Sequence, residues 1–288
     1  QLSMPQNNRQ VFKLVLYSAG VVIITLIVVV MFRNKLPKEV SSNPSVWPKF
    51  DVNALPPDSN GQMIRYGYRL IMETSNIAGP DVQNPKMRFA GNNLECRNCH
   101  FNGGQDKNTM SFVGVANRYP AYSKRHERMS DLKERIDDCF ERSMNGNKLP
   151  AESYELKSIL AYMNWLSKGV PKDLEGVTVK DIDFPKREPD KEKGKSLYMV
   201  KCITCHGFDG LGVLKNPIIQ GGVKYVIPPI AGDDSFNNGA GMSRMERLVK
   251  FLKTQMPKDN PGSLSLEEAY DIAGYVSGLK RPEYKGEK

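Results

Sequence analysis

The sequence contains two copies of one short motif, CRNCH at residues 96–100 and CITCH at residues 202–206. In the pattern C-x-x-C-H, two thiols form thioether bonds to a haem and the histidine binds its iron. With five cysteines and three histidines in 288 residues, random placement gives roughly 0.001 such strings per chain, so two copies are not accidental. The sequence therefore predicts two covalently bound haem c groups, attached through Cys96, Cys99, His100 and through Cys202, Cys205, His206.

Three other uses of a C-x-x-C pair fit the chain poorly. Disulfide frameworks are typical of small secreted domains with many cysteines. A zinc site does not need a histidine directly after the second cysteine, and a thioredoxin-like motif needs a βαβ pattern that the sequence lacks. Because bacteria attach haem c outside the cytoplasm, we expect both haem domains on the periplasmic side.

A run without charged residues begins at Leu14 and ends at Phe32. At about 1.5 Å per residue, these nineteen residues just cross a hydrocarbon core of ~30 Å. A cleaved signal peptide is the alternative, but Arg33 and Lys35 follow the run where small residues would mark a cleavage site. We therefore expect residues 1–35 to be a single-pass anchor in the bacterial inner membrane.

The chain is basic, with a formal net charge of +9 at pH 7. Its lysines and arginines are interspersed with acidic residues and accompany no nucleic-acid recognition motif, so we expect no nucleic-acid partner. A positive field of this kind favours small anions or an acidic redox partner.

Beyond the anchor, the chain divides into two similar halves. Residues 36–60 hold five prolines and predict an extended tether. Residues 61–172 and 191–288 each carry one haem motif among helical segments, and a charged linker at residues 173–190 joins them. The predicted fold is therefore mostly α, with one transmembrane helix followed by two tandem class I cytochrome c domains.

Apolar periodicity predicts the helices of both halves. In residues 131–144 the apolar positions form one inward-facing stripe, and Ser265 with Glu268 forms a capping box that begins the last helix. The members of the stripe are Leu132, Ile136, Cys139, Phe140 and Met144. The predicted helices cover residues 62–74, 131–144 and 150–168 in the first half, and 191–201, 243–254 and a segment from Leu266 in the second.

The motif histidine fills one axial position of each haem, so the other position needs a second ligand. In the second half the candidate is Met256, which lies 50 residues after His206 and just ahead of the last helix. Pro257 follows it and would keep that loop rigid. Met242 and Met245 are the alternatives.

In the first half the equivalent place is held by Cys139, the cysteine left over when four form thioethers. Met144, about one turn further along, is a more ordinary ligand, and His126 is the spare histidine, although it lies among charged residues. A lone cysteine can also be a small apolar residue on a helix face. Residue types and positions alone leave these alternatives open.

Longer strings around these positions resemble one family. The strings ECRNCHFNGG, FVGVANRYPAY, RIDDCFERSMNG, LAYMNWLSKGVP, GAGMSRMERLVKFLKTQMP and LSLEEAYDIAGYV are similar to the dihaem thiosulfate dehydrogenases over about residues 62–280. The resemblance implies that two thiosulfate ions are joined into tetrathionate and that the electrons pass to a respiratory acceptor. It also implies that Cys139 is the second axial ligand beside His100, that Arg135 and Ser143 hold the anion, and that Arg118 or Arg125 supplies a further cation.

The alternative hypothesis is that the protein is a non-catalytic dihaem electron-transfer subunit of a membrane respiratory complex such as a terminal oxidase. The predicted membrane anchor favours this carrier. The combination of Cys139, Arg135 and Ser143, with Arg125 as a further cation, favours an enzyme that acts on a small sulfur oxyanion, because guanidinium groups match the oxygens of such an anion.

Overall fold

The helices that frame the first haem motif cross each other at a glycine. The computed structural model describes residues 47–108, 110–172, 174, 182–215 and 224–286. In the first half, α2 (Ser59–Met72) packs against α6 (Tyr154–Trp165). A Cβ atom at Gly67 would lie 2.0 Å from the carbonyl oxygen of Ser158, so only glycine allows this crossing.

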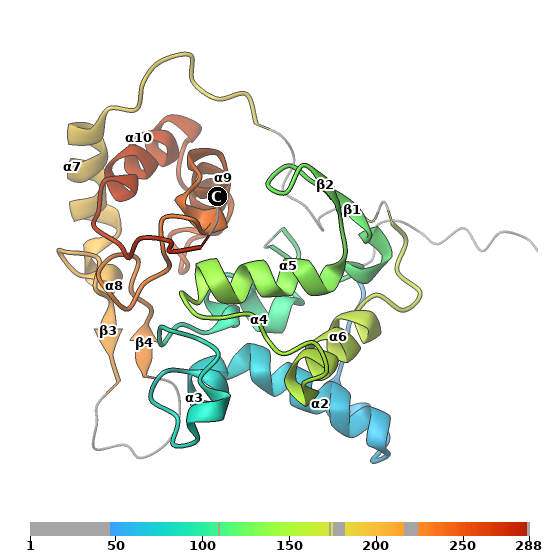
Figure 1. The fold of residues 1–288 in the computed structure, drawn as a ribbon. Coiled ribbons are helices and arrows are strands. Elements are labelled where there is room, and N and C mark those ends of the chain that lie inside the picture. Colours follow the sequence, from blue (N-terminus) through green and yellow to red (C-terminus); the bar gives the residue numbers. More distant parts are fainter. Residues whose placement is uncertain (1–46, 109, 173, 175–181, 216–223, 287–288) are drawn as a thin grey trace, which may run out of the picture. The chain divides into compact units, whose positions relative to one another are not determined.

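The second half repeats this crossing. There α7 (Lys191–Lys201) packs against α10 (Leu266–Ser277), and a Cβ atom at Gly194 would lie 2.0 Å from the carbonyl oxygen of Asp271. The predicted capping box of Ser265 and Glu268 is confirmed at the start of α10, and α9 (Met245–Gln255) packs beside that helix. Figure 1 shows α7, α9 and α10 together, and α2 with α6 in a separate group. The same glycine contact in both halves is the structural sign of a duplicated unit.

The two haem motifs occupy short helical turns. CRNCH forms η3 (Cys96–Asn98) and leads into α4 (Phe101–Gly104), whereas CITCH leads from α7 into α8 (Ile203–His206). In the first half α3 (Thr74–Ala78) and η2 (Pro85–Met87) separate α2 from the motif, whereas Cys202 is the C-cap residue of α7. The remaining short turns are η1 (Val52–Ala54), η4 (Ala116–Arg118) and η6 (Gly241–Ser243).

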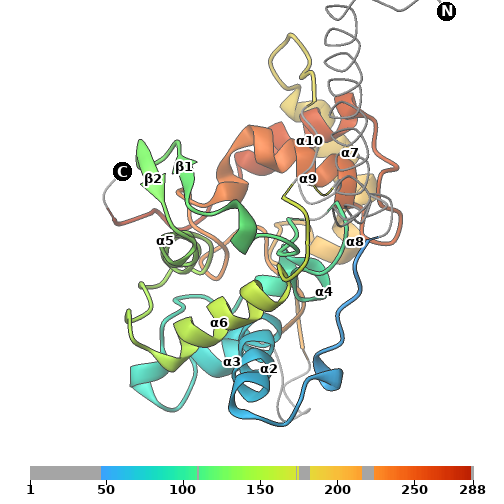
Figure 2. The same ribbon diagram turned by 90° about the vertical axis from the view of Figure 1, so that its right-hand side faces the viewer.

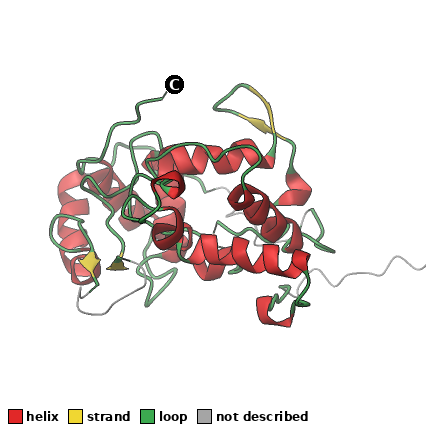
Figure 3. Cartoon of the chain, turned by 60° about the horizontal axis from the view of Figure 1, so that its bottom comes forward, coloured by secondary structure: helices red, strands yellow, loops and turns green. Residues whose placement is uncertain are grey.

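Two small hairpins accompany the helices. Strands β1 (Ala121–Ser123) and β2 (Arg128–Ser130) pair antiparallel, as do β3 (Val213–Leu214) and β4 (Tyr225–Ile227). Figure 3 shows that helices make up most of the regular structure and that, among the described residues, strands lie only in these two places. Neither pair of strands was predicted from the sequence.

The helix that carries Cys139 begins at α5 (Leu132–Asp138), whose first turn is fixed by a capping box of Asp131 and Glu134. It continues as η5 (Cys139–Ser143), a turn of π-helix. The predicted inward stripe is confirmed, because its four apolar members other than the cysteine are buried.

The second half also reaches the first haem motif. Asn92 donates to the carbonyls of both Ser143 and Ser235, at 3.0 and 3.1 Å, and Asn237 donates to the carbonyl of Glu141 at 2.9 Å. Figure 2 shows α9 together with α7 and α10, and η6, which directly precedes α9, contacts η5 of the first half. These bonds bring residues of the second half to the wall of the first haem site.

The structure contradicts the prediction of a transmembrane helix. Within the described residues no helix is long and apolar enough to cross a membrane. The longest of the described helices, α2, has 14 residues and spans about 21 Å, which is short of a hydrocarbon core of ~30 Å. The predicted segment, residues 14–32, lies outside the described residues. For the part of the chain that the structure describes, the predictions of a transmembrane helix, of a membrane partner and of a single-pass inner-membrane localisation are therefore wrong, and the fold is mostly helical with two haem domains.

Candidate functional site

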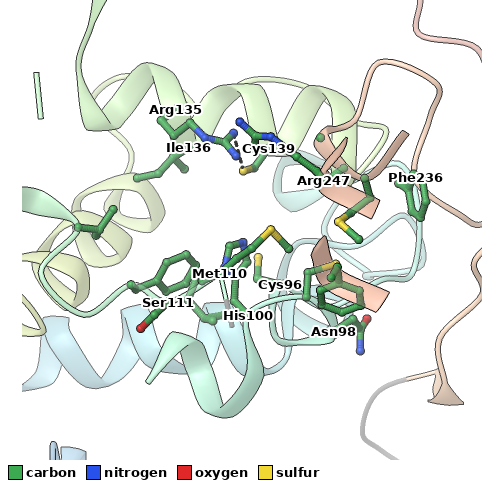
Figure 4. Close-up of a pocket in the computed structure, with 18 of the residues that line it drawn as sticks. Cys96, Asn98, His100, Met110, Ser111, Arg135, Ile136, Cys139, Phe236 and Arg247 are labelled. Carbon is green, nitrogen blue, oxygen red and sulfur yellow. Dashed lines mark hydrogen bonds between the residues drawn. The ribbon is translucent and has the colours of Figure 1, made fainter. Parts of the chain in front are cut away.

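A cavity of about 510 Å³ lies beside the first haem motif. Figure 4 shows His100 and Cys96 on one side of this cavity and Cys139 on the opposite side. Most of the wall is apolar and includes Ile71, Leu94, Phe112, Ile136, Phe140 and Met163. Two thiols and an imidazole facing an apolar cavity form the environment that a covalently bound haem requires.

The imidazole of His100 is fixed by its neighbours. Its Nδ1 is hydrogen-bonded to the carbonyl of Met110, and its ring stacks on Phe112 with centroids 4.2 Å apart. Burial lowers the pKa of His100 to about 4, so the ring is neutral at pH 7. Because Nδ1–H is directed at a carbonyl, Nε2 is the atom left to bind iron.

The two thiols of this motif are held in the apolar wall. Burial raises the pKa of both Cys96 and Cys99 to about 12, so neither ionises at neutral pH. Thr74 Oγ1 donates to Cys96 Sγ at 3.3 Å and accepts from Cys96 N at 3.1 Å, which fixes the first thiol in place. These residues fit a haem c attached through the two sulfurs and bound by His100.

Cys139 lies where the helix changes form. A hydrogen bond of 2.9 Å from Met144 N to Cys139 O closes the π-turn of η5, a rare geometry that recurs at functional sites. Arg135 Nη1 donates to Cys139 Sγ at 3.1 Å, and the charge of Cys139 raises the pKa of Arg135 above its usual value. The guanidinium therefore stabilises negative charge on this sulfur.

A second cavity, of about 300 Å³, adjoins the first. The residues that line both cavities are Tyr119, Arg135, Ser143, Gly241 and Arg247. Figure 4 shows Arg135 and Arg247 beside Cys139. The sulfur of Cys139 thus lies close to the boundary between an apolar cavity and a polar one.

The wall of the second cavity is rich in cations. Lys124, Arg125 and Arg244 line it in addition to the two arginines shared with the first cavity, and Asp138 is the only carboxylate among its described lining residues. Together these side chains make the second cavity a favourable place for an anion.

The cations of this wall repel one another. Burial, followed by repulsion from Arg142, lowers the pKa of Arg125. Desolvation, followed by repulsion from Arg135 and Arg244, lowers the pKa of Arg247. An anion bound among them would relieve this repulsion.

The second haem motif is more exposed to solvent than the first. Burial raises the pKa of Cys202 to about 11, Cys205 is exposed, and burial lowers the pKa of His206. The hairpin that follows exposes the apolar side chains of Val213 and Leu214, a surface that a bound haem can shield. Two thiols, an imidazole and exposed apolar surface fit a second haem c.

Of the methionines predicted as candidates for the second haem, Met256 is the C-cap residue of α9 and is partly buried against the core. Met242 lines the first cavity instead, and Met245 Sδ accepts from Ser277 Oγ at 3.9 Å. Met256 therefore stays the predicted axial ligand beside His206.

The alternatives for the first haem lie in different places. Met144 is buried and lines the first cavity, so it stays near the haem. His126 Nε2 is hydrogen-bonded to Asp138 Oδ2 at 3.1 Å, and His126 is not among the described residues that line either cavity. Arg118 lines the first cavity and donates to the carbonyl of Val113 at 3.2 Å, whereas Arg125 lines the second.

Three cations of this wall, Lys124, Arg244 and Arg247, were not predicted from the sequence. Lys124 and Arg125 lie in the turn of the β1–β2 hairpin, which was not predicted. Arg244 is the N-cap residue of α9, and Arg247 lies in its first turn. Their spacing of three residues places them on one face of a helix, and it is the signal that could have identified them as a pair.

Comparisons with known proteins place both halves among cytochromes. A family model described as SoxA/TsdA, cytochrome c domain matches residues 87–171, and one described as cytochrome c oxidase, cbb3-type, subunit III matches residues 189–276. The chain is 41% identical over 239 residues to a thiosulfate dehydrogenase of Allochromatium vinosum, a match that covers 80% of this chain and 83% of that protein. It is 35% identical over 231 residues to a thiosulfate dehydrogenase of Stutzerimonas stutzeri, covering 80% of this chain and 71% of that protein.

A solved structure, thiosulfate dehydrogenase (TsdBA) from Marichromatium purpuratum in the as-isolated form, is similar to this fold with a TM-score of 0.73 and 28% sequence identity. The match covers 85% of this chain and 52% of that chain, so the present chain spans about half the length of that structure.

Proposed function

Because this chain belongs to the thiosulfate dehydrogenase family, we propose that it oxidises thiosulfate to tetrathionate beside Cys139 and passes the electrons to a respiratory acceptor outside the cytoplasm. Membership makes it an oxidoreductase with two covalent haem c groups. The observation that carries the proposal is the 3.1 Å hydrogen bond from Arg135 to Cys139 Sγ, at the boundary between the haem cavity and the cationic cavity.

The reaction balances without a leaving group. Two thiosulfate dianions form one sulfur–sulfur bond, giving one tetrathionate dianion and two electrons. When bound, the haem c groups supply two irons, each of which accepts one electron.

The residues of the chain bind and orient the anion in this proposal. Arg135 and Arg125 contact the sulfonate oxygens, because a planar guanidinium offers paired donors to such oxygens. Ser143, which lines both cavities, adds a hydroxyl donor. The terminal sulfur of the bound thiosulfate then faces the sulfur of Cys139, which lines the haem cavity. The apolar wall of the first cavity excludes water from this contact.

The test is direct reduction by the substrate. Adding thiosulfate to the purified, oxidised dihaem protein is expected to reduce both haems, followed as the change in their visible absorbance. One tetrathionate should form for every two haems reduced. Haems that stay oxidised in thiosulfate, but exchange electrons rapidly with a respiratory complex, would instead identify a carrier, the function that the oxidase-subunit match of residues 189–276 favours.

Replacing the cation beside the sulfur tests the role of the arginine. Arg135→Ala is expected to lower kcat/KM for thiosulfate about 100-fold, because it removes both a donor to the anion and the hydrogen bond to Cys139 Sγ. The measurement is steady-state oxidation at a series of thiosulfate concentrations.

Arg128→Ala is the matched control for this variant. Arg128 is exposed on the β1–β2 hairpin and pairs with Glu134 at 2.6 Å, away from both cavity walls. Its loss should leave kcat/KM within about twofold. Equal losses in the two variants would contradict the assignment of Arg135 to the anion site.

A further inference from the structure

The site around Cys139 must accept two anions to make one product. Tetrathionate carries a sulfonate group at each end, and each end comes from a separate thiosulfate ion. A bound haem occupies the cavity between His100 and Cys139, so the room for a second anion must be sought elsewhere. The second cavity is the one that shares its wall with the first at Arg135 and Ser143.

Three cations of the second cavity are not used by the proposed function, namely Lys124, Arg244 and Arg247. Arg244 and Arg247 come from the second haem half, and neither forms an ion pair with any described residue. The carboxylate on this wall, Asp138, is already engaged by Arg125 at 3.7 Å and by Arg142 at 3.3 Å. Arg244 and Arg247 are therefore available to bind an anion.

The backbone at this place also favours an anion. Helix α9 has 11 residues, and its N-cap residue, Arg244, makes no side-chain capping hydrogen bond. The start of a helix carries the positive end of the helix dipole. Gly241, Arg244 and Arg247 all line the second cavity, so the start of α9 and the two guanidinium groups lie at one wall.

We propose that Arg244 and Arg247 form a second anion subsite, which holds the sulfonate of the second thiosulfate ion and then the distal sulfonate of tetrathionate. This subsite rests on the proposed function and adds its substrate geometry. Arg135, Arg125 and Ser143 hold the first anion, and the second lies at Arg244 and Arg247 in the same 300 Å³ cavity, with its terminal sulfur directed toward the first. One sulfur–sulfur bond forms, no bond breaks, and the two electrons leave as in the overall reaction.

The subsite makes the second haem half part of the anion site. The loop before α9 is held against the first half by the bond from Asn237 to the carbonyl of Glu141, and Asn237 also donates to Asn145 Oδ1 at 3.1 Å. Arg244 and Arg247 follow this loop directly. Their position therefore depends on contact between the halves.

Binding of two anions of different length tests the subsite. The oxidised dihaem protein is titrated calorimetrically with tetrathionate, which has two sulfonates, and with methanesulfonate, which has one. Arg244→Ala should weaken tetrathionate binding about tenfold and leave methanesulfonate binding unchanged. Arg135→Ala should weaken the binding of both anions, because either anion needs the first subsite.

Arg244 is the better residue to replace, because it lines the second cavity alone, whereas Arg247 lines both and is also within reach of the haem cavity. Arg128→Ala controls for the loss of one positive charge from the surface. Equal weakening of tetrathionate binding in Arg128→Ala and Arg244→Ala would overturn the subsite in favour of a general effect of charge. The subsite would also be overturned if Arg247→Ala changed the haem potential and left tetrathionate binding unchanged. That arginine would then bind a haem carboxylate instead of the anion.

The experiments distinguish a failure of the proposed function from a failure of the second anion subsite. If thiosulfate does not reduce the wild-type protein, the catalytic proposal is wrong whatever the calorimetry shows. If thiosulfate reduces it and Arg244→Ala binds both anions like the wild type, the second subsite is wrong and the catalytic proposal stands.

Discussion

Cys139→Met is expected to abolish thiosulfate turnover, lowering it by more than about 1000-fold, while both haems stay attached. The haems are attached through other cysteines, so haem content is an internal control. Methionine keeps a sulfur that can bind iron but has no thiolate, and it cannot take the charged hydrogen bond that Arg135 now donates at 3.1 Å. Turnover is measured with thiosulfate and an artificial electron acceptor.

Electron paramagnetic resonance of the same variant tests the ligand. The wild-type protein should show a low-spin signal of thiolate-ligated haem, and Cys139→Met should lose it. Met144→Leu is the matched variant, because Met144 is the other sulfur-bearing side chain one turn along that lines the first cavity. Leucine conserves most of its volume, so turnover should stay within about threefold. If Met144→Leu changes the signal and Cys139→Met does not, Met144 is the ligand and the prediction fails.

Gly67→Ala is expected to lower the free energy of unfolding of the first half by about 3 kcal/mol. The new Cβ would lie 2.0 Å from the carbonyl oxygen of Ser158 and 2.9 Å from Cβ of Tyr162. A backbone oxygen cannot rotate away, so α2 and α6 must separate. Separation exposes Leu156 and Tyr162, which are fully buried at this crossing. The free-energy cost of exposing them outweighs the gain of about 1 kcal/mol that alanine brings in helix propensity.

Denaturant unfolding followed by far-ultraviolet circular dichroism measures the effect. Gly194→Ala makes the equivalent clash, with the carbonyl of Asp271, and should destabilise the second half in the same way. Asn60→Ala is the control, since Asn60 is exposed in the first turn of α2. A Gly67→Ala protein that unfolds at the same denaturant concentration as Asn60→Ala would show that the crossing is looser than the structure indicates.

The features that the sequence predicted correctly are set by residues close together in the chain. The two C-x-x-C-H strings, the stripe on the Cys139 helix and the capping box of Ser265 with Glu268 each depend on spacing within one turn or a few turns. The second cavity depends instead on a hairpin and on a helix start that lie more than 100 residues apart. No local pattern specifies that approach, so Arg244 and Arg247 went unnoticed.

The membrane prediction relied on the hydropathy of residues 14–32 and on the charged residues that follow them. Within the described residues the helices are short and have buried faces against other helices, as α2 and α10 do. Their apolar residues pack against neighbouring helices. Such packing requires apolar residues along one face of a helix, whereas a membrane-spanning helix is apolar on all faces.

The π-turn at Cys139 has a consequence for how such sites change in evolution. In an α-helix each residue turns the chain by about 100°, so removing one residue from this turn would rotate Ser143 and Met144 onto other faces. The helical segment of α5 before the turn would stay as it is. The gain or loss of a single codon is therefore enough to exchange the side chains that face the anion, without any change to the segment that positions Arg135.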